Sequence, residues 1–307
     1  MNMKIEILSL FICIGFNSIL SAQSESAKFS IEPVLQWHTM EIVSTVKLDM
    51  NSAGLQLPTG RAHGEELLDV EFPRIISPYL FTIPIDSTTT IEIAIQQGQL
   101  SILDIDKLVR TATKFPTILD LTNNSLNRKI LVPLQELLAL LVRHHVPATL
   151  PHPLVTQTTK VYTGVIIFAQ ERLPIYGRQD SAYLRPCLFP KVWDTEGTLV
   201  YERNMVSPEI AKTRGIAKYT TIDQVLQQTP SGISPYLQEL VGDRPLKILA
   251  DKIYGKLPTD PVISKDDAII LYSSDNNRRL LTEGRVVIVL APELLIQTFT
   301  FSNTSSP

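Results

Sequence analysis

The fold is decided by the stretch TDPVISKDDA (residues 259–268), which leads after a short segment to LLTEGRVVIVL (residues 280–290). The first block can start a helix, because Ser264 suits the N-cap position and the acids that follow suit the positive end of the helix dipole. Gly284 suits the left-handed residue that closes a helix. We therefore expect one helix over residues 265–283.

The apolar residues after Gly284 predict a buried strand. Residues 286–290 read Val-Val-Ile-Val-Leu without a polar residue, whereas a half-exposed strand alternates. We expect this strand to be internal to a mixed sheet that the preceding helix covers. The predicted fold class is α+β, with mixed sheets and packed helices. The helix–glycine–strand unit is architectural and indicates no reaction.

The composition predicts a folded protein with a sizeable core. The chain has 307 residues, of which 44% are hydrophobic and 19% charged, with a net charge of -3. Aromatic residues make up 7% and no run of Lys or Arg occurs, so we expect no nucleic-acid partner. The 21 prolines outnumber the 13 glycines and are spread along the chain, which predicts short, rigid connections.

The N-terminus has the pattern of an export signal. Lys4 precedes an apolar run over residues 7–16, and the small residues Ser21 and Ala22 precede a polar segment. The run is roughly half as long as a bilayer span, which favours a cleavable signal over an anchor. We expect residues 1–22 to be removed, and the mature chain to lie in the periplasm or at the periplasmic face of the outer membrane without a transmembrane helix.

The two cysteines have different settings. Cys13 lies inside the apolar run and follows the bulky Ile12, so we do not expect it to carry a lipid. Cys187 is then the only cysteine of the mature chain, which excludes an intramolecular disulfide. Its apolar neighbours Leu188 and Phe189 predict burial as a small hydrophobic residue, not a role as a nucleophile.

Sequence patterning predicts two α+β halves, residues 23–150 and 151–307, with the boundary in a proline-rich connection. In the first half we expect a hairpin over residues 29–37 and 41–50, helices over 60–72, 88–97, 102–113 and 131–142, and a separate helix start at Ser77-Pro78. In the second half we expect a buried strand over residues 161–169 that pairs with residues 187–193. The latter should form a hairpin with residues 198–201, with Gly197 in the turn. We also expect helices that begin after Thr220 or Thr221 and at Ser234-Pro235, and a strand over residues 245–250.

The pentapeptide Ile-Ser-Pro-Tyr-Leu occurs twice, at residues 76–80 and 233–237. Serine at the cap with proline at the first helical position is a helix-start pattern. Duplication of a segment and convergence of two helix starts both account for the repeat.

The histidines form one cluster in the sequence, His144, His145 and His152. Adjacent histidines point to different faces of a helix or strand, and no carboxylate stands at metal-ligand spacing beside them. Cations at a helix terminus explain the histidines better than a zinc site does. We predict no metal ligand.

The acids Asp260, Asp266 and Asp267 are the candidate carboxylates for acid–base chemistry. Helix capping explains all three better than catalysis does. The sequence contains no nucleophile elbow, phosphate-binding glycine-rich loop or His-Glu-x-x-His motif. We therefore predict no catalytic residue, no cofactor-binding residue and no cofactor.

Two blocks in the second half have a recognisable pattern, residues 162–169 with 184–201, and residues 260–268 with 280–290. They resemble exported bacterial envelope proteins related to the flagellar assembly lipoproteins, a group common in spirochaetes and proteobacteria. In the first half, Leu35-Gln-Trp37 is similar to that family's opening hairpin. The resemblance implies an α+β fold and a non-catalytic role, and it supplies no catalytic residues.

The chain departs from the family pattern at two points. Residues 168–171 read Phe-Ala-Gln-Glu where the family has Asp-Ala-Arg-Gly, and no lipobox is present. The resemblance therefore implies a relative that is not lipid-anchored, either soluble in the periplasm or held there by a partner.

The function we expect is that of a non-catalytic structural or assembly protein of the periplasm or envelope, linked to the flagellar motility apparatus. Its expected partners are envelope or flagellar proteins, or further copies of itself. The alternative is an exported hydrolase that acts on cell-wall or sugar substrates. A cleft with converging acids would favour the hydrolase, and flat surface patches would favour the structural protein.

Overall fold

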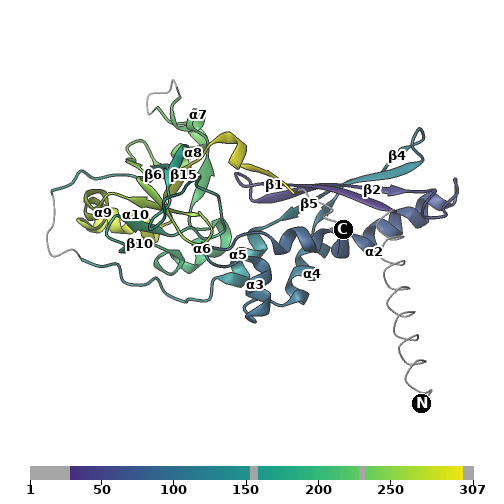
Figure 1. Cartoon of the computed structure of the whole chain (residues 1–307), viewed down its shortest axis with the longest axis horizontal. Helices are drawn as coiled ribbons and strands as arrows, with labels where there is room; N and C mark the ends of the chain where they lie inside the picture. Colours follow the sequence, from purple (N-terminus) through teal and green to yellow (C-terminus); the bar gives the residue numbers. More distant parts are fainter. Residues whose placement is uncertain (1–27, 153–157, 228–231, 300–307) are drawn as a thin grey trace, which may run out of the picture.

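The computed structural model describes residues 28–152, 158–227 and 232–299. Figure 1 shows an elongated molecule, in which the sheet and long helix of the first half extend away from the more rounded second half. None of the helices within these ranges combines the length and hydrophobicity that crossing a bilayer requires. The predicted signal peptide, residues 1–22, lies outside the described residues.

The first half is built on an antiparallel sheet with the strand order β16-β1-β2-β5-β3, and β4 also pairs with β5. The predicted hairpin over residues 29–37 and 41–50 is confirmed as β1 and β2. The last strand, β16, returns from the end of the chain to pair with β1. The strands are β1 (Phe29–Gln36), β2 (Glu41–Asp49), β3 (Thr113–Lys114), β4 (Ile118–Asp120), β5 (Ser125–Pro133) and β16 (Ile296–Thr298).

Within the described residues, four helices accompany this sheet, and the longest of them, α2, contacts β1, β2 and β5. The helices predicted over residues 88–97 and 102–113 are present in shorter form as α3 and α4. The helices are α2 (Gly60–Phe81), α3 (Ile91–Gln96), α4 (Ile102–Arg110) and α5 (Gln135–Leu141).

Helix α2 contradicts the separate helix start predicted at Ser77-Pro78. It continues through Pro73 and Pro78, although each interior proline costs roughly 3 kcal/mol. The compensation lies in its buried face, Leu68, Phe72, Ile76 and Leu80, spaced by four residues and all at most 1% exposed. At about 1.5–3 kcal/mol each, the four side chains together contribute about 6–12 kcal/mol on burial, which offsets the roughly 6 kcal/mol that the two prolines cost.

The helix predicted over residues 131–142 is wrong in its first part. Residues 131–133 belong to β5, where they pair with residues 41–43 of β2. Ile130 and Val132 both lie on the buried face of that strand. Both are β-branched, which favours a strand, and packing of this face stabilises the strand over a helix. The helix α5 begins only after Pro133.

The second half is built on a parallel sheet with the strand order β11-β15-β6-β12. The strand predicted after Gly284 is β15, which is internal and fully buried, as expected. Val286 and Ile288 join the main core, and Val287 and Val289 join a second cluster with α7 and α8. The expectation that this particular sheet is mixed is wrong. Its strands are β6 (Val165–Phe168), β11 (Lys218–Thr220), β12 (Leu246–Leu249) and β15 (Val286–Val289).

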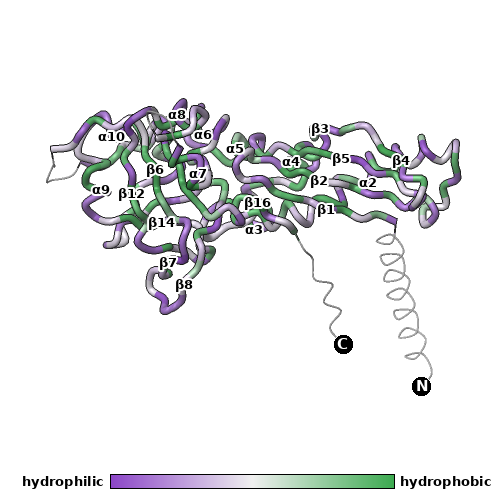
Figure 2. The backbone as a smooth tube through the Cα atoms, turned by 90° about the horizontal axis from the view of Figure 1, so that it is seen from above, coloured by the Kyte–Doolittle hydropathy of each residue, from purple (hydrophilic) through white to green (hydrophobic). Residues whose placement is uncertain are grey.

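A second, mixed sheet of this half has the order β10-β9-β14-β13. The predicted hairpin through Gly197 is confirmed as β9 and β10, and Gly197 has a φ of 84°. The predicted pairing of residues 187–193 with 161–169 is wrong, because β9 pairs with β14 and β10. A separate hairpin, β7–β8, projects from this half with a hydrophilic tip (Figure 2). The strands are β7 (Arg172–Pro174), β8 (Ser181–Tyr183), β9 (Val192–Asp194), β10 (Leu199–Tyr201), β13 (Lys252–Tyr254) and β14 (Asp260–Ile263).

The helix predicted over residues 265–283 is broken into α9 and α10. Asn277 is fully buried and donates through Nδ2 to the Ile270 carbonyl at 3.0 Å, so it caps the end of α9. Ser274 is extended and accepts from the Asn277 amide, so it starts a new helix. The described helical segments of this half are η1 (Arg203–Met205), α6 (Pro208–Arg214), α7 (Ile222–Val225), α8 (Pro235–Val241), α9 (Lys265–Tyr272), α10 (Asp275–Thr282) and η2 (Pro292–Leu294).

The repeated pentapeptide has two different structural contexts. Its first copy, residues 76–80, lies near the end of α2, whereas in the second copy Pro235 is the first residue of α8. Only the second copy therefore starts a helix.

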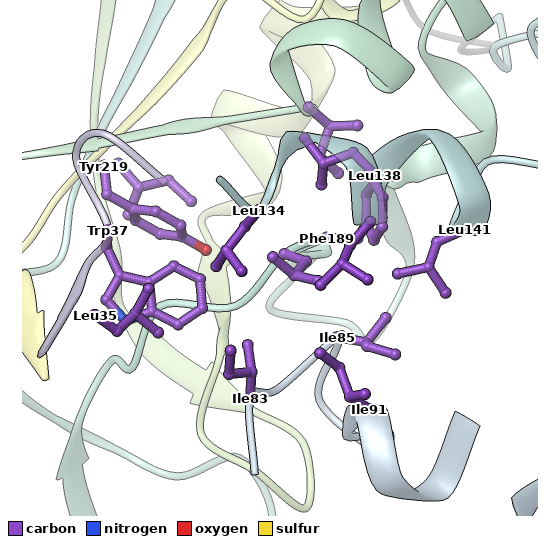
Figure 3. Close-up of a cluster of buried hydrophobic side chains, with 14 of the residues drawn as sticks. Leu35, Trp37, Ile83, Ile85, Ile91, Leu134, Leu138, Leu141, Phe189 and Tyr219 are labelled. Atoms are coloured by element: carbon purple, nitrogen blue, oxygen red, sulfur yellow. The ribbon is translucent and has the colours of Figure 1, made fainter. Parts of the chain in front are cut away.

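The two halves share one hydrophobic core. Figure 3 shows Leu35, Trp37, Ile83 and Leu134 of the first half gathered with Phe189 and Tyr219 of the second. Trp37 and Tyr219 make an edge-to-face contact with ring centroids 6.0 Å apart. Helix α5 of the first half also packs against α6 of the second. The α+β fold class is confirmed, and its two halves pack as one body.

Candidate functional site

Two of the three histidines predicted as helix-terminus cations lie just beyond the C-terminal end of a helix, α5. His144 and His145 follow the end of α5, and the His144 ring donates through Nε2 to the Val206 carbonyl at 2.8 Å. His145 and His152 are exposed. In the parts of the chain that the structure describes, no group of three or more His, Cys, Asp and Glu side chains could hold a metal ion.

Two of the three candidate acids occupy the first turn of a helix, as predicted. Asp266 and Asp267 lie in α9, and the Asp267 amide donates to Ser264 Oγ at 3.1 Å. Asp260 contradicts the prediction, because it is a fully buried residue of β14. It therefore caps no helix.

Asp260 accepts hydrogen bonds from three directions. Oδ1 accepts from the Lys191 amide at 3.1 Å and from Thr259 Oγ1 at 3.1 Å. Oδ2 accepts from Trp193 Nε1 at 3.2 Å. Burial raises the pKa of Asp260, while hydrogen bonds from Ser87, Lys191, Trp193 and Thr259 oppose the shift. A raised carboxyl pKa is a feature of catalytic acids, but this carboxyl has no surface that a substrate could contact.

Cys187 lies beside this carboxylate and is buried, as predicted. Tyr219 Oη donates to the Cys187 carbonyl and accepts from the Cys187 amide, both at 3.0 Å. Burial, with a further contribution from Asp260, raises the pKa of the Cys187 thiol well above its usual value. Because the thiolate is the reactive form, this cysteine is a structural residue.

These buried polar residues lie where the first half meets the second. We call Ser87, Cys187, Tyr219, Thr259 and Asp260 the junction. Around it the backbone of the first half accepts three hydrogen bonds from the second: Leu188 N to Pro84 O at 3.1 Å, Phe189 N to Ile85 O at 2.8 Å and Leu257 N to Ser87 O at 2.8 Å. The junction therefore joins the two halves, and its acid and thiol are part of that attachment.

A cleft of about 590 Å³ opens on another side of the contact between the halves. The β1–β2 turn and the start of α5 line it from the first half. The end of α6, the start of β11 and helix α8 line it from the second. Its lining residues are Trp37, His38, Thr39, Met40, Gln135, Thr213, Arg214, Gly215, Ala217, Lys218, Tyr236, Glu239, Leu240 and Gly284.

The charged residues of the cleft are two cations and one acid. Lys218 is partly buried, and its Nζ lies 3.6 Å from the centroid of the Tyr236 ring. Burial, followed by the charge of Arg214, lowers the pKa of Lys218. Glu239 is the acid among the described lining residues, so those residues provide no pair of converging carboxylates of the kind expected of a hydrolase.

Sequence reasoning missed Ser87, Tyr219, Arg214, Lys218 and Tyr236. They come from separate segments of the chain, and no local pattern links them. Asp260 carried a usable signal, because it directly precedes the apolar run Pro-Val-Ile and could have been assigned to a buried strand.

Comparison with protein families matches both halves to domains of one protein. Residues 28–140 match the model of the N-terminal domain of Treponema pallidum Tp0624. Residues 164–292 match the model of the second domain of the same protein. The two matches, in the same order along the chain, indicate a spirochaete-type family. No curated protein matches the chain.

Proposed function

We propose that this chain is a non-catalytic structural or assembly protein of a bacterial cell envelope. The proposal rests on where the side chains that could perform chemistry lie. Asp260, Cys187 and Tyr219 are buried in the junction and hydrogen-bonded to their neighbours. Their hydrogen bonds stabilise the contact between the two halves. This use of the side chains supports a role that depends on the shape of the protein and not on a reaction.

The elongated first half supports a role in protein contacts. Ile118 and Leu121, in and beside β4, are 69% and 74% exposed, and Phe115, just after β3, is 41% exposed. Figure 1 shows β4 at the end of the first half that points away from the second half. Exposed apolar side chains gathered at one end of a molecule are typical of a surface that another protein covers.

The place of action and the link to motility rest on the sequence. The N-terminal pattern favours export to the periplasm, and the resemblance described above favours an envelope protein connected with the flagellar apparatus. Both Tp0624 matches come from a spirochaete, one of the groups in which the resembling proteins are common. We therefore propose that the chain acts together with the flagellar motility apparatus.

A tagged gene replacement in the source organism tests the proposal. We expect the full chain in the periplasmic or outer-membrane fraction, with a mature N-terminus near Gln23, and envelope or flagellar proteins captured with it. The matched control is a chain that begins at Met1 followed directly by Gln23, which should stay in the cytosol and capture none of them.

A strain without the gene should show altered motility or envelope ultrastructure. An uncleaved chain in the cytosol would contradict the location. Normal cells together with measurable hydrolysis of cell-wall fragments by the purified chain would replace the structural role with the hydrolase.

A further inference from the structure

The cleft between the halves combines positive charge with apolar surface. Lys218 and Arg214 contribute the charge, and no carboxylate of the described residues lies within ion-pair distance of either one. The Arg214 guanidinium bonds the Glu283 carbonyl, which fixes it without neutralising it. Lys218 contacts the face of Tyr236, and the charge of Glu239 acts on it less than burial and Arg214 do.

Burial is the main influence on both cations. It lowers the pKa of Lys218, where the charge of Arg214 adds to the shift and Glu239 opposes it. It also lowers the pKa of Arg214, where Arg285 adds to the shift and Tyr201 and Glu283 oppose it. An anion bound in the cleft would offset the burial of these charges and would gain charge-assisted hydrogen bonds. Two cations in a concave site, with no carboxylate of the described residues in ion-pair contact, therefore favour an anionic ligand.

The charge balance favours a ligand with one negative charge. Arg214 and Lys218 are positive and Glu239 is negative, so the charged lining residues sum to one positive charge. The C-terminal end of α6, with its partial negative charge, also borders the cleft at Gly215. Both features disfavour a phosphate dianion and suit a single carboxylate.

The remaining surface suits an apolar or aromatic group. Tyr236 is 55% exposed and stands at the cleft, where its ring can stack on a ligand. Met40, Leu240 and Trp37 contribute further apolar atoms to the lining. The volume of about 590 Å³ lies within the range of small-ligand sites.

We propose that this cleft binds a single carboxylate attached to an aromatic or apolar group. Arg214 and Lys218 hold the carboxylate, and Tyr236 contacts the apolar group. Because the lining comes from both halves, a bound ligand also bridges them. Two sources share this chemistry, the C-terminal residue of a polypeptide and a free small acid. The inference stands apart from the proposed function, because it holds wherever the chain acts.

The test is a binding titration of the chain from Gln23 with N-acetyl-L-phenylalanine and with its carboxamide. We expect the acid to bind and the amide to bind at least roughly tenfold more weakly, because hydrogen bonds to charged groups contribute that much or more. Equal binding of acid and amide, or tighter binding of inorganic phosphate than of the acid, would overturn the proposal. This comparison uses the unaltered chain and does not depend on the folding of any variant.

Variants then locate the site. Lys218→Gln and Arg214→Gln should each weaken binding of the acid roughly tenfold. Lys212→Gln is the matched control, since Lys212 lies on α6 outside the cleft lining and should change nothing. Loss of binding in the control alone, or in none of the three, would overturn the assignment to this cleft.

A peptide with a free C-terminal phenylalanine separates the two sources. Binding of the peptide as tight as that of the acid supports a polypeptide C-terminus, and binding of the acid alone supports a free small acid. Binding of neither would overturn the proposal.

Discussion

Replacing Asp260 tests whether this residue stabilises the contact between the two halves. In Asp260→Ala, the Lys191 amide and Trp193 Nε1 lose their acceptor, whereas the Thr259 hydroxyl can rotate towards another. An unpaired buried donor costs about 1–3 kcal/mol, so two of them predict a loss of about 2–6 kcal/mol in the free energy of unfolding. Asp260→Asn keeps one acceptor oxygen and should lose about 1–3 kcal/mol.

The assay is urea unfolding of the chain from Gln23, followed by far-ultraviolet circular dichroism. Asp251→Ala is the matched control, because Asp251 is an exposed acid just before β13, in the same sheet, and should stay within about 0.5 kcal/mol of the unaltered chain. The reasoning is refuted if Asp260→Ala unfolds within 1 kcal/mol of the control, at roughly the limit of such measurements.

Comparison of the unaltered chain with Asp260→Asn should reveal how the free energy of unfolding depends on pH. Burial raises the pKa of Asp260 in the folded chain above its usual 3.8, so the folded state holds this proton to higher pH than the unfolded state does. The stability that this proton contributes is complete below pH 3.8 and is lost as the pH rises through the raised pKa. The unfolding free energy of the unaltered chain, minus that of Asp260→Asn, should therefore fall over this window. A difference that stays flat or rises would contradict the burial.

Three further substitutions or reactions test other parts of the structure. Val287→Asp should lose about 3–5 kcal/mol in urea unfolding, because it places an unpaired charge in the buried centre of β15, and a soluble variant that melts within a degree or two of the unaltered chain would show that the strand is peripheral. Gly255→Ala should cost more stability than Gly177→Ala, since both glycines have positive φ but only at Gly255 would the new Cβ meet Ser87, at 2.4 Å; equal losses would show that this approach of the halves is not tight. Cys187 should resist Ellman's reagent in the folded chain and react fully in urea, and rapid reaction without urea would contradict its burial.

The elements that sequence could predict are those in which local signals and packing agree. Ser264 caps α9, Gly284 adopts the left-handed conformation, and β15 is buried, each as its residue type and pattern indicated. The hairpin of β1 and β2 followed from alternation alone. In these places the sequence within a few residues contained the necessary information.

Two of the failures share one physical cause, because distant packing outweighed the local pattern. Pro73 and Pro78 did not end α2, because burial of the continuous apolar face of that helix against the sheet stabilises it. Residues 131–133 became a strand because β2 was available to pair with them. A local sequence window contains neither the sheet nor the partner strand.

The candidate site was less predictable than the fold. Asp260 looked like a capping acid because a helix follows it closely, and one of its hydrogen-bond partners, Ser87, lies far away in the chain. The cleft draws on the β1–β2 turn, α6, β11 and α8, which only the tertiary structure brings together. Charge composition could not reveal it, because two cations in a nearly neutral chain form no pattern.

The two halves form one structural unit, and the two tryptophans of the chain can test this. Trp37 lies at the contact between the halves, and Trp193 lies in β9 of the second half. Trp193→Phe leaves Trp37 as the fluorescent probe, and Trp37→Phe leaves Trp193. In each variant, urea unfolding followed by fluorescence should coincide with unfolding of the same protein followed by far-ultraviolet circular dichroism. If the Trp37 signal changes at a lower urea concentration than the secondary structure, or if Trp193 reports a separate transition, the halves are independent domains and the account is contradicted.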